Sequence, residues 1–563
     1  MTDQSQNLRT GGRILVDQLV IQGCDRIFTV PGESFLAVLD ALHDTPSVQT
    51  VICRQEGGVG FMACADGALT QRPGVAFVTR GPGATNASIG VHVAMQDSQP
   101  MILFIGDVDR GMRDREGFQE VDFTAMFTPL AKWATRIDDA ARIPEYVARA
   151  FSVAMSGRPG PVVIALPEDM LCDVVEAVDR PRVEPVWQAP SPSRLAALEQ
   201  CLHDAERPIA IIGGAGWTPE AGRSFQLFAE RWGIPVAAAF RRQDAFANDS
   251  AVWAGNLGYG PNPKLAARIK AADLILAVGA RLGEATTDGY SLITPDHPGQ
   301  VLVQVHPDPD EFNHVYQVDV PICADMEAFA AFAASSIIPD QARRVKSTGA
   351  LPFASGAEAH AEWREWNTPA PFDTPLDLAM CVAAMRAVLP ADTIICNGAG
   401  NFSGWWHRYW AYGGAGTQLA PTAGAMGYGP PAAVAACLRH PDRMVVALAG
   451  DGDFMMNGQE LATAIQYGCD MLVLVIDNGA YGTIRMHQER EYPRRVSGTT
   501  LNNPDFAALA RAYGGWAATV AATGDFAPAL DAAIAQRGVR LLHLKTDVER
   551  ISAGTTISAL RGM

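Results

Sequence analysis

The residues of this sequence best suited to chemistry follow two apolar runs in its last third. Gly450-Asp451-Gly452 comes after the run Met444–Ala449, and Asp477-Asn478 comes after the run Met471–Ile476. A helix-length stretch near Gln459–Tyr467 separates them, so the segment is typical of a strand–helix–strand unit. In open α/β sheets, ligands bind outside the carboxyl ends of the strands. We therefore expect both polar groups at one ligand-binding edge.

The types of these residues indicate a divalent cation. Asp451 offers a carboxylate, Asn478 a neutral amide oxygen, and the backbone carbonyl of Ala480 a third oxygen. Mg²⁺ prefers such hard oxygen ligands and usually keeps phosphate oxygens in its shell. Gly450 and Gly452 would let the backbone approach those phosphates. An ordinary strand-to-helix turn explains Gly-Asp-Gly alone, but not the second polar strand end at this spacing.

Short β-rich runs alternate with amphipathic helical stretches along the whole chain, which predicts an α/β fold with doubly wound parallel sheets. At about 150 residues per domain, 563 residues allow three or four domains. Composition favours three, at 1–180, 194–345 and 365–563, separated by the Pro-rich stretch Asp179–Ser193 and a weaker boundary at Ser347–Glu358. The predicted strands are Arg26–Val30, Thr50–Cys53, Val75–Thr79, Met101–Ile105, Pro161–Leu166, Pro208–Ile212, Pro235–Ala238, Leu274–Val278, Val301–Val305, Thr393–Cys396, Met444–Ala449, Met471–Ile476 and Leu541–Leu544.

Composition excludes several functional classes. A net charge of −17 and a pI near 5.1 argue against a nucleic-acid partner and against a basic membrane-surface protein. No apolar run approaches the roughly 20 residues that span a bilayer. The stretch Met1–Gly12 lacks the apolar core of a signal peptide, so we expect a cytoplasmic protein. The ten cysteines form no CxxC pair, which favours reduced, buried thiols over a zinc or disulfide framework.

Gly450-Asp451-Gly452, followed by Asn478 twenty-seven residues after Asp451, resembles the metal–diphosphate motif of thiamine diphosphate (ThDP) enzymes. Nearly the whole chain is similar to the acetolactate synthase, pyruvate oxidase and 2-oxo acid decarboxylase superfamily, and most of all to acetolactate synthase large subunits. The resemblance implies a pyrimidine-binding N-terminal domain, a central domain and a diphosphate-binding C-terminal domain. It also implies ThDP and Mg²⁺ as cofactors, 2-oxo acid substrates, and a homodimer or homotetramer with active sites at subunit interfaces.

In the N-terminal third, Glu56 follows the predicted strand Thr50–Cys53. Alone it would be a helix-start acid, but the resemblance implies that it bonds the pyrimidine ring of the cofactor and promotes loss of the thiazolium proton. The turn Gly81–Asn86 is similar to the family's Gly-Pro-Gly-Ala-Thr-Asn stretch. The resemblance further implies that Phe118 and Gln119 line the substrate site and that Lys132 lies in the substrate channel, although a solvated lysine is the alternative.

In the C-terminal third, the resemblance implies cofactor contacts from several short segments. Met426 would wedge beneath the cofactor, and the backbone of Gly424 and Met426 would hold its aminopyrimidine edge. The remaining candidates for cofactor binding are Gly398, Asn401, Ser403, Gly450, Gly452, Asp453 and Tyr481.

Two departures from the synthases bear on the active site. Asn401, Phe402 and Ser403 stand where synthases carry Gln-His-Gln. His487 aligns with a tryptophan that, in the synthases, determines which second 2-oxo acid is accepted. His487 and Ile484 are therefore candidates for the substrate pocket. These differences leave the substrates open.

The central third leaves its ligand open as well. Arg281 aligns with a flavin-contacting arginine, but Gln304 and His306 replace two aspartates of the same site. Bound FAD, bound ADP and an empty site are all compatible with this pattern.

The activity we expect is decarboxylation of a 2-oxo acid followed by carboligation of the fragment to a second carbonyl. Simple decarboxylation that releases an aldehyde is the alternative. Glyoxylate carboligase is disfavoured because that subgroup lacks the glutamate that Glu56 supplies. From other classes, the rivals are a flavin or nicotinamide oxidoreductase and a non-catalytic regulatory homologue.

Overall fold

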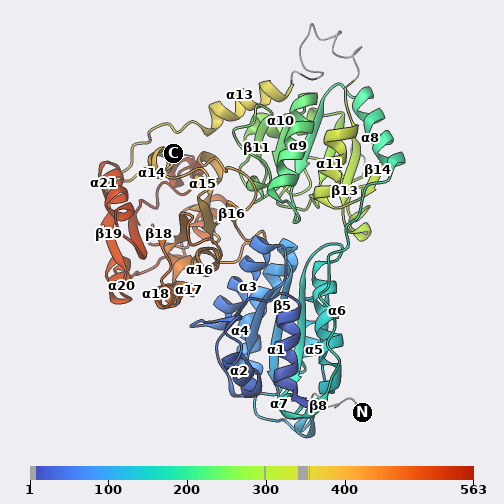
Figure 1. Ribbon diagram of the computed structural model, residues 1–563. Coiled ribbons are helices and arrows are strands. Elements are labelled where there is room, and N and C mark those ends of the chain that lie inside the picture. The colour runs from blue at the N-terminus through green and yellow to red at the C-terminus, as the bar shows by residue number, and fades with distance from the viewer. Residues whose placement is uncertain (1–7, 297–298, 340–352, 354, 563) are drawn as a thin grey trace. The chain divides into compact units, whose positions relative to one another are not determined.

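The computed structural model describes residues 8–296, 299–339, 353 and 355–562 (Figure 1). These residues form two compact units. The first holds the chain up to Val186 together with Pro430–Pro441 and Met455–Cys469. The second holds Trp187–Gly429, Asp442–Phe454 and the chain from Asp470 onward. The predicted domain end at 345 and most of the predicted boundary Ser347–Glu358 lie outside the described residues.

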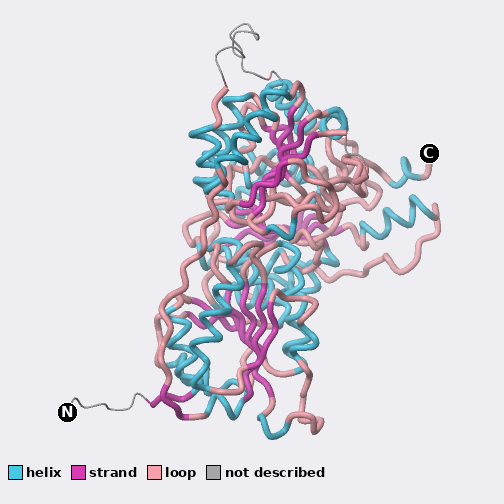
Figure 2. The backbone as a smooth tube through the Cα atoms, turned by 90° about the vertical axis from the view of Figure 1, so that its right-hand side faces the viewer, coloured by secondary structure: helices cyan, strands magenta, loops and turns pink. Residues whose placement is uncertain are grey.

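Three six-stranded parallel sheets form the framework of the described chain and confirm the predicted fold class (Figure 2). Their strand orders are β3-β2-β4-β5-β7-β6, β11-β10-β9-β12-β13-β14 and β16-β15-β17-β18-β20-β19. When each sheet's strands are counted from one, the first and third sheets share the order 2-1-3-4-6-5. The second sheet has the order 3-2-1-4-5-6 of a dinucleotide-binding fold. In each sheet the order reverses beside its first strand.

The first sheet and its helices make up most of the first unit. A small antiparallel ribbon of β1 (Leu8–Thr10) and β8 (Val174–Glu176) joins the two ends of this region. The sheet strands are β2 (Arg26–Thr29), β3 (Gln49–Ile52), β4 (Gly74–Val78), β5 (Met101–Asp107), β6 (Trp133–Arg136) and β7 (Pro161–Pro167). The helices are α1 (Gly11–Ile21), α2 (Leu36–His43), α3 (Glu56–Thr70), α4 (Gly81–Asp97), α5 (Phe123–Phe127), α6 (Ile143–Met155) and α7 (Glu168–Cys172).

The second sheet is built by the middle of the chain. Its strands are β9 (Pro208–Ile212), β10 (Val236–Ala238), β11 (Trp253–Asn256), β12 (Leu274–Val278), β13 (Val301–His306) and β14 (Val320–Cys323). Its helices are α8 (Pro192–Asp204), α9 (Pro219–Trp232), α10 (Pro263–Ala271), α11 (Met326–Ser336) and α13 (Ser355–Asn367). Local signals set the limits of α9: Thr218 caps its first turn, Pro219 follows, and Gly233 ends it with a φ of +74°.

The third sheet carries the predicted metal-binding segment. Its strands are β15 (Ile394–Asn397), β16 (Gln418–Leu419), β17 (Val445–Gly450), β18 (Met471–Asp477), β19 (Trp516–Val520) and β20 (Val539–Lys545). The helices of this part of the sequence are α14 (Leu378–Val388), α15 (Ser403–Tyr409), α16 (Gly429–Arg439), α17 (Asp451–Asn457), α18 (Leu461–Gln466), α19 (Gly482–Glu491), α20 (Phe506–Ala512), α21 (Thr523–Ile534) and α22 (Ile557–Leu560).

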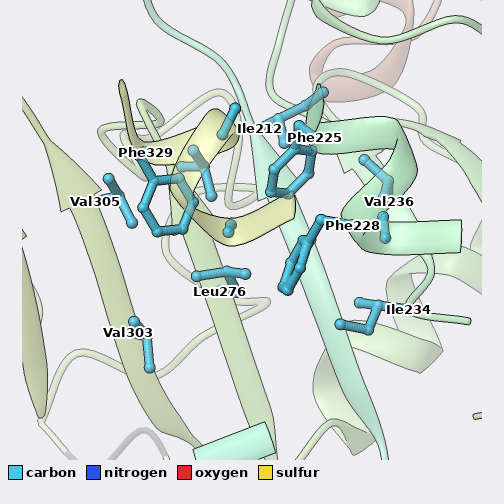
Figure 3. Close-up of a cluster of buried hydrophobic side chains, with 14 of the residues drawn as sticks. Ile212, Phe225, Phe228, Ile234, Val236, Leu276, Val303, Val305 and Phe329 are labelled. Atoms are coloured by element: carbon cyan, nitrogen blue, oxygen red, sulfur yellow. The ribbon is translucent and has the colours of Figure 1, made fainter. Parts of the chain in front are cut away.

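The central strands of the sheets are buried on both faces, which is why they read as unbroken apolar runs. In the second sheet, Ala210 and Ile212 join a cluster with Phe225 and Phe329 from α9 and α11 (Figure 3). The alternate strand residues, such as Ile211, face a second cluster on the other side. Every strand predicted from an apolar run is present, with its ends shifted by two residues at most.

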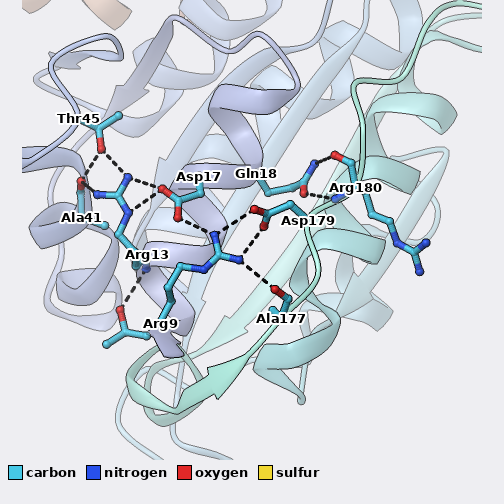
Figure 4. Close-up of polar contacts among 10 residues, drawn as sticks. Arg9, Arg13, Asp17, Gln18, Ala41, Thr45, Ala177, Asp179 and Arg180 are labelled. Atoms are coloured by element: carbon cyan, nitrogen blue, oxygen red, sulfur yellow. Dashed lines mark hydrogen bonds and ion pairs between the residues drawn. The ribbon is translucent and has the colours of Figure 1, made fainter. Parts of the chain in front are cut away.

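β8 ends at Glu176 and α8 begins at Pro192, so the Pro-rich stretch predicted as a linker has no helix or strand before its last two residues, which open α8. Its first residues are nevertheless fixed to α1 (Figure 4). The Gln18 side chain exchanges two hydrogen bonds of 2.9 Å with the backbone of Arg180. Arg9 pairs with Asp17 at 2.7 Å and with Asp179 at 2.8 Å.

An ion pair ties the end of α16 to α3 and to the loop before β2 within the first unit. Arg439 contacts Asp66 on α3 at 2.5 Å and Asp25 at 2.7 Å. The Asp66 side chain is 3% exposed, whereas that of Asp25 is 61% exposed. Hydrogen bonds to both carboxylates raise the pKa of Arg439 against the opposing effect of its burial.

We expect Asp66→Asn to lower the free energy of unfolding by about 3 kcal/mol, because it leaves a half-buried arginine without its shielded partner. Asp25→Asn removes a screened partner of the same arginine and should cost less than about 1 kcal/mol. Urea denaturation of the two variants measures the difference. Equal losses of unfolding free energy in the two variants would mean that burial of the carboxylate does not determine how strongly it pairs with Arg439.

None of the described helices combines the length and the apolar composition that crossing a bilayer requires.

Candidate functional site

The structure brings Asp451 and Asn478 together at one edge of the third sheet. Strands β17 and β18 are parallel neighbours, with Gly450 opposite Ile476. Asp451 is the first residue of α17, and its side chain is buried. The backbone N–H of Ala480 donates to Asp451 Oδ2 at 3.2 Å and to Asn478 Oδ1 at 3.1 Å. One donor therefore holds both predicted ligand oxygens at the same place.

Two side chains that sequence reasoning missed complete this cluster. Asn503 donates to Asp451 Oδ2 at 2.7 Å and to Asp477 Oδ1 at 2.8 Å. His543 Nε2 lies 2.8 Å from Asp477 Oδ2. His543 is a polar residue inside the apolar run of β20, and that break in the pattern could have revealed it. Asn503 lies in a loop and carries no such signal.

The two neighbouring carboxyl groups titrate differently. Burial, together with the negative charge of Asp477, raises the pKa of Asp451 to about 6, although the hydrogen bond from Asn503 opposes this. Burial also raises the pKa of Asp477, but hydrogen bonds from His543 and Asn503 outweigh it, so the net shift is downward. A divalent cation at Asp451 would favour its ionised form.

The point where the strand order reverses, between β15 and β17, is organised by Asp453. Its Oδ1 accepts hydrogen bonds from the N–H groups of Gly427, at 2.7 Å, and Ala399, at 3.1 Å. Its Oδ2 is buried and has no hydrogen-bond partner among the described residues. Burial raises the pKa of this carboxyl to about 7. A buried acceptor without a described partner calls for an explanation, and a polar ligand at the point where the strand order reverses supplies one.

Glycines at this crevice are required by the protein's own packing. A Cβ atom at Gly398 would lie 2.2 Å from Asp453 Oδ1. At Gly450 it would lie 2.9 Å from the ring of Phe402, and at Gly452 it would lie 2.5 Å from the ring of Tyr481. The missing Cβ atoms therefore leave room for Asp453, Phe402 and Tyr481. This packing requires the glycines whether or not a ligand binds.

We expect Gly398→Ala to destabilise the fold by about 1–3 kcal/mol through overpacking against Asp453. Gly404 offers a matched control six residues away, because a Cβ atom there meets nothing within 4 Å and the residue lies in α15. Gly404→Ala should be neutral or slightly stabilising. The midpoint of thermal unfolding checks both, and a tolerated Gly398→Ala would contradict the tight packing.

The other candidates in the C-terminal third differ in how far their polar groups are already used. Asn401 donates to the Ile551 carbonyl and accepts from Thr483, both at 3.0 Å. The Ser403 hydroxyl is buried and donates to the Gly400 carbonyl. Gly424 is exposed, with a φ of +69°, and Met426 is half-buried.

The two substrate-pocket candidates lie on α19. Ile484 is 55% exposed, and His487 is exposed as well. Because they are three residues apart on a helix, they share one face. That face begins just after Tyr481, the residue that precedes α19 and packs on Gly452.

In the first unit, Glu56 begins α3 just after the carboxyl end of β3. Asn86 on α4 donates to Glu56 Oε2 at 3.0 Å. The turn predicted at Gly81–Asn86 is instead the start of α4, so its amides belong to a helix N-terminus. The buried carboxylate of Glu460 accepts from the N–H groups of Arg54 and Gln55, each at 3.0 Å. The start of α3 is therefore held by two contacts: Asn86 binds the Glu56 side chain, and Glu460 binds the backbone just before it.

The structure brings Gln119 to the same edge but separates Lys132 from it. The Gln119 carbonyl accepts from Gly81 N–H at 3.0 Å, with a φ of +65° at Gln119, and Phe118 is 73% exposed. Lys132 precedes β6 at the amino ends of the strands, and Nζ donates to the carbonyls of Val153 and Ser156 at 2.6 Å. It caps the end of α6 and lies at the opposite sheet edge from Glu56.

In the central region, the side chains that replace the two aspartates are used within the protein. Gln304 donates to the Ala280 carbonyl at 3.3 Å, and His306 Nδ1 accepts from Asp308 N–H at 3.0 Å. Both are buried, while Arg281 is half-buried beyond the end of β12. Gln304 and His306 thus have partners within the protein, and they supply no carboxylate where the family's site has two aspartates.

Comparison with known proteins agrees with this architecture. Three family models match the chain: the N-terminal thiamine pyrophosphate (another name for ThDP) binding domain of thiamine pyrophosphate enzymes at residues 9–126, their central domain at 195–332, and their C-terminal thiamine pyrophosphate binding domain at 398–544.

Curated relatives cover most of the chain. The acetolactate synthase large subunit of Parasynechococcus marenigrum is 32% identical over 90% of this chain and 82% of its own length. The acetolactate synthase isozyme 2 large subunit of Escherichia coli is 28% identical over 95% of both chains. The acetolactate synthase large subunit of Corynebacterium glutamicum is 29% identical over 93% of this chain and 84% of its own length. The chain therefore belongs to the thiamine pyrophosphate enzyme family and is a homologue of acetolactate synthase large subunits.

Proposed function

We propose that this protein is a ThDP- and Mg²⁺-dependent enzyme that decarboxylates a 2-oxo acid and joins the resulting fragment to a second carbonyl compound. The observation that carries the proposal is the shared contact of Ala480 N–H with Asp451 and Asn478. It supports a metal site made of one carboxylate, one amide and a backbone carbonyl. In this proposal residues 1–180, 194–345 and 365–563 are the pyrimidine-binding, central and diphosphate-binding domains.

The described residues fit both cofactors. Asp451, Asn478 and Ala480 offer the hard oxygens that Mg²⁺ requires. The Asp453 carboxylate accepts from the N–H groups of Gly427 and Ala399, and its buried Oδ2, which has no hydrogen-bond partner among the described residues, suits a polar ligand group. In the proposal, Gly398, Gly424 and Met426 lie around that group. In the proposal, Gly450, Gly452, Tyr481, Asn401 and Ser403 complete the diphosphate side of the site. The bound cofactor supplies a carbanion and an electron sink.

Glu56 has the acid–base role in this proposal. Its carboxyl group would exchange a proton with a ring nitrogen of the pyrimidine, while Asn86 keeps Oε2 in place. Phe118 and Gln119 would line the substrate side of the same edge. Lys132 has no role in this chemistry unless a partner subunit brings it to another site, because its ammonium caps α6.

In this proposal the substrates are 2-oxo acids, and the identity of the carbonyl compound that accepts the fragment is left open. Ile484 and His487 on the exposed face of α19 are the proposed specificity residues. Because His487 stands where the synthases carry tryptophan, release of an aldehyde is the second candidate. We further propose a cytoplasmic homo-oligomer, dimer or tetramer, with its active sites at subunit interfaces and no nucleic-acid or membrane partner. No step of the proposed reaction uses a flavin.

A panel of 2-oxo acids tests this function. The protein is loaded with ThDP and Mg²⁺, and CO₂ release is measured with and without aldehyde or 2-oxo acid acceptors. CO₂ release with a carboligated product supports the first candidate, and aldehyde without carboligation supports the second. No CO₂ from any acid, together with NAD(P)H turnover or a yellow protein, would overturn the proposal in favour of an oxidoreductase.

A further inference from the structure

The predicted metal loop is flanked by a short stretch of chain, Thr499–Asn503. Leu501 N–H donates to the Gly479 carbonyl at 2.8 Å, and Tyr481 N–H donates to the Thr499 carbonyl at 2.9 Å. Ala480 and Thr500 form an isolated antiparallel bridge. The loop that carries Asn478 and Ala480 is therefore one strand of a small ribbon, and the stretch Thr499–Asn503 is the other.

At the end of this ribbon, the Asn503 amide lies between two carboxylates. Its Nδ2 donates to Asp451 Oδ2 at 2.7 Å and to Asp477 Oδ1 at 2.8 Å. An amide nitrogen has two N–H groups, so this contact uses its full donor capacity. Both bonds go to charged acceptors, which are the stronger class of hydrogen bond.

Each acceptor is also held by a group other than Asn503. Ala480 N–H donates to the same Oδ2 of Asp451, and Gly479 N–H donates to Oδ1 of Asp477 at 3.0 Å. His543 holds the other oxygen of Asp477. Asn503 thus joins the two sets of contacts, because its amide donates to both carboxylates.

Two carboxylates at the ends of adjacent strands repel each other, and the repulsion grows as water is excluded. A donor bridging them offsets that repulsion and fixes the orientation of each. Side chains that orient the ligands of a metal typically contribute 10- to 100-fold to metal affinity without touching the metal.

We propose that Asn503 is a positioning residue for Mg²⁺: by bridging Asp451 and Asp477, it orients the Asp451 carboxylate toward the cation. This inference rests on the proposed function, since it concerns the same metal site. It assigns no direct contact between Asn503 and the metal, the cofactor or the substrate.

The test measures ThDP binding to the full-length apoprotein by tryptophan fluorescence, titrated with Mg²⁺ at fixed ThDP. Asn503→Ala removes both donors, and Asn503→Leu removes them while keeping the side-chain volume. Asn502→Ala is the matched control, because it is the same change at the exposed neighbouring residue. Thermal unfolding of each apoprotein is recorded in parallel.

We expect both Asn503 variants to need about 10- to 100-fold more Mg²⁺ for half-maximal ThDP binding, with near-normal ThDP affinity once Mg²⁺ is saturating. Asn502→Ala should match the wild type. A purely structural role would instead lower the unfolding midpoint and weaken ThDP binding at every Mg²⁺ concentration, which overturns the proposal. An unchanged Mg²⁺ requirement in both Asn503 variants overturns it as well. Wild-type protein without any Mg²⁺-dependent ThDP binding would overturn the proposed function, and this inference with it.

Discussion

Glu56→Gln is expected to slow turnover by about 100- to 10,000-fold while leaving ThDP affinity nearly unchanged. The substitution keeps the size of the side chain and its acceptor oxygen toward Asn86, but removes the group that exchanges a proton. Cofactor binding should survive because the glutamine still fits the turn held by Glu460. Hydrogen–deuterium exchange at the thiazolium carbon of bound ThDP, followed by NMR, measures the step directly.

Glu116→Gln is the control for this change, because Glu116 is an exposed glutamate of the same unit. It should leave both exchange and turnover at the wild-type level. Normal exchange in Glu56→Gln would remove the acid–base role from Glu56. Loss of ThDP binding in that variant would assign Glu56 to binding instead of proton exchange.

Asp451→Ala is expected to abolish Mg²⁺-dependent retention of ThDP, with a loss of at least about 100-fold in affinity. Asp451 supplies the single carboxylate among the proposed ligands, and losing even groups that merely orient a ligand costs 10- to 100-fold. Calorimetric titration of the apoprotein with ThDP, with and without Mg²⁺, makes the measurement.

The apoprotein of this variant should be as stable as the wild type or more so, because the change removes a buried carboxylate that faces Asp477. Asp531→Ala, at an exposed residue of α21, is the control and should bind ThDP normally. An unchanged Mg²⁺ dependence in Asp451→Ala would remove the metal assignment. A large drop in apoprotein stability would mean that Asp451 stabilises the fold and is not kept mainly for ligand binding.

Each of the two units has a buried carboxylate that organises the backbone beside a candidate residue. Glu460 and Asp453 are buried carboxylates that hold backbone N–H groups, one beside Glu56 and the other between Gly398 and Gly427. Burial raises the pKa of both groups. A buried carboxylate costs stability unless it is hydrogen-bonded, and both of these groups accept hydrogen bonds from the backbone that they hold in place.

The sequence alone was enough to predict the central strands and the residues at their carboxyl ends. Strands such as β17 and β18 are buried on both faces, so each appears as an unbroken apolar run that ends where polar residues begin. Asp451 and Asn478 come just after such runs, and Glu56 comes soon after the predicted strand Thr50–Cys53, so their places at the carboxyl ends of strands could be deduced from the sequence. The sequence similarity to a known family then suggested their roles.

The tertiary structure decided what no local pattern contains. The strands β6, β11, β14, β16 and β19 were not predicted; β6 and β19 lack an apolar run because their residues are mostly half-buried. Asn503 reaches Asp451 through a contact 52 residues apart in sequence, and Lys132 lies at the opposite sheet edge from Glu56. Pro430–Pro441 and Met455–Cys469 pack with the first unit although they belong to the last third of the sequence. Burial leaves a periodic trace in the neighbouring residues, whereas a contact between distant segments depends on how whole elements pack and leaves none.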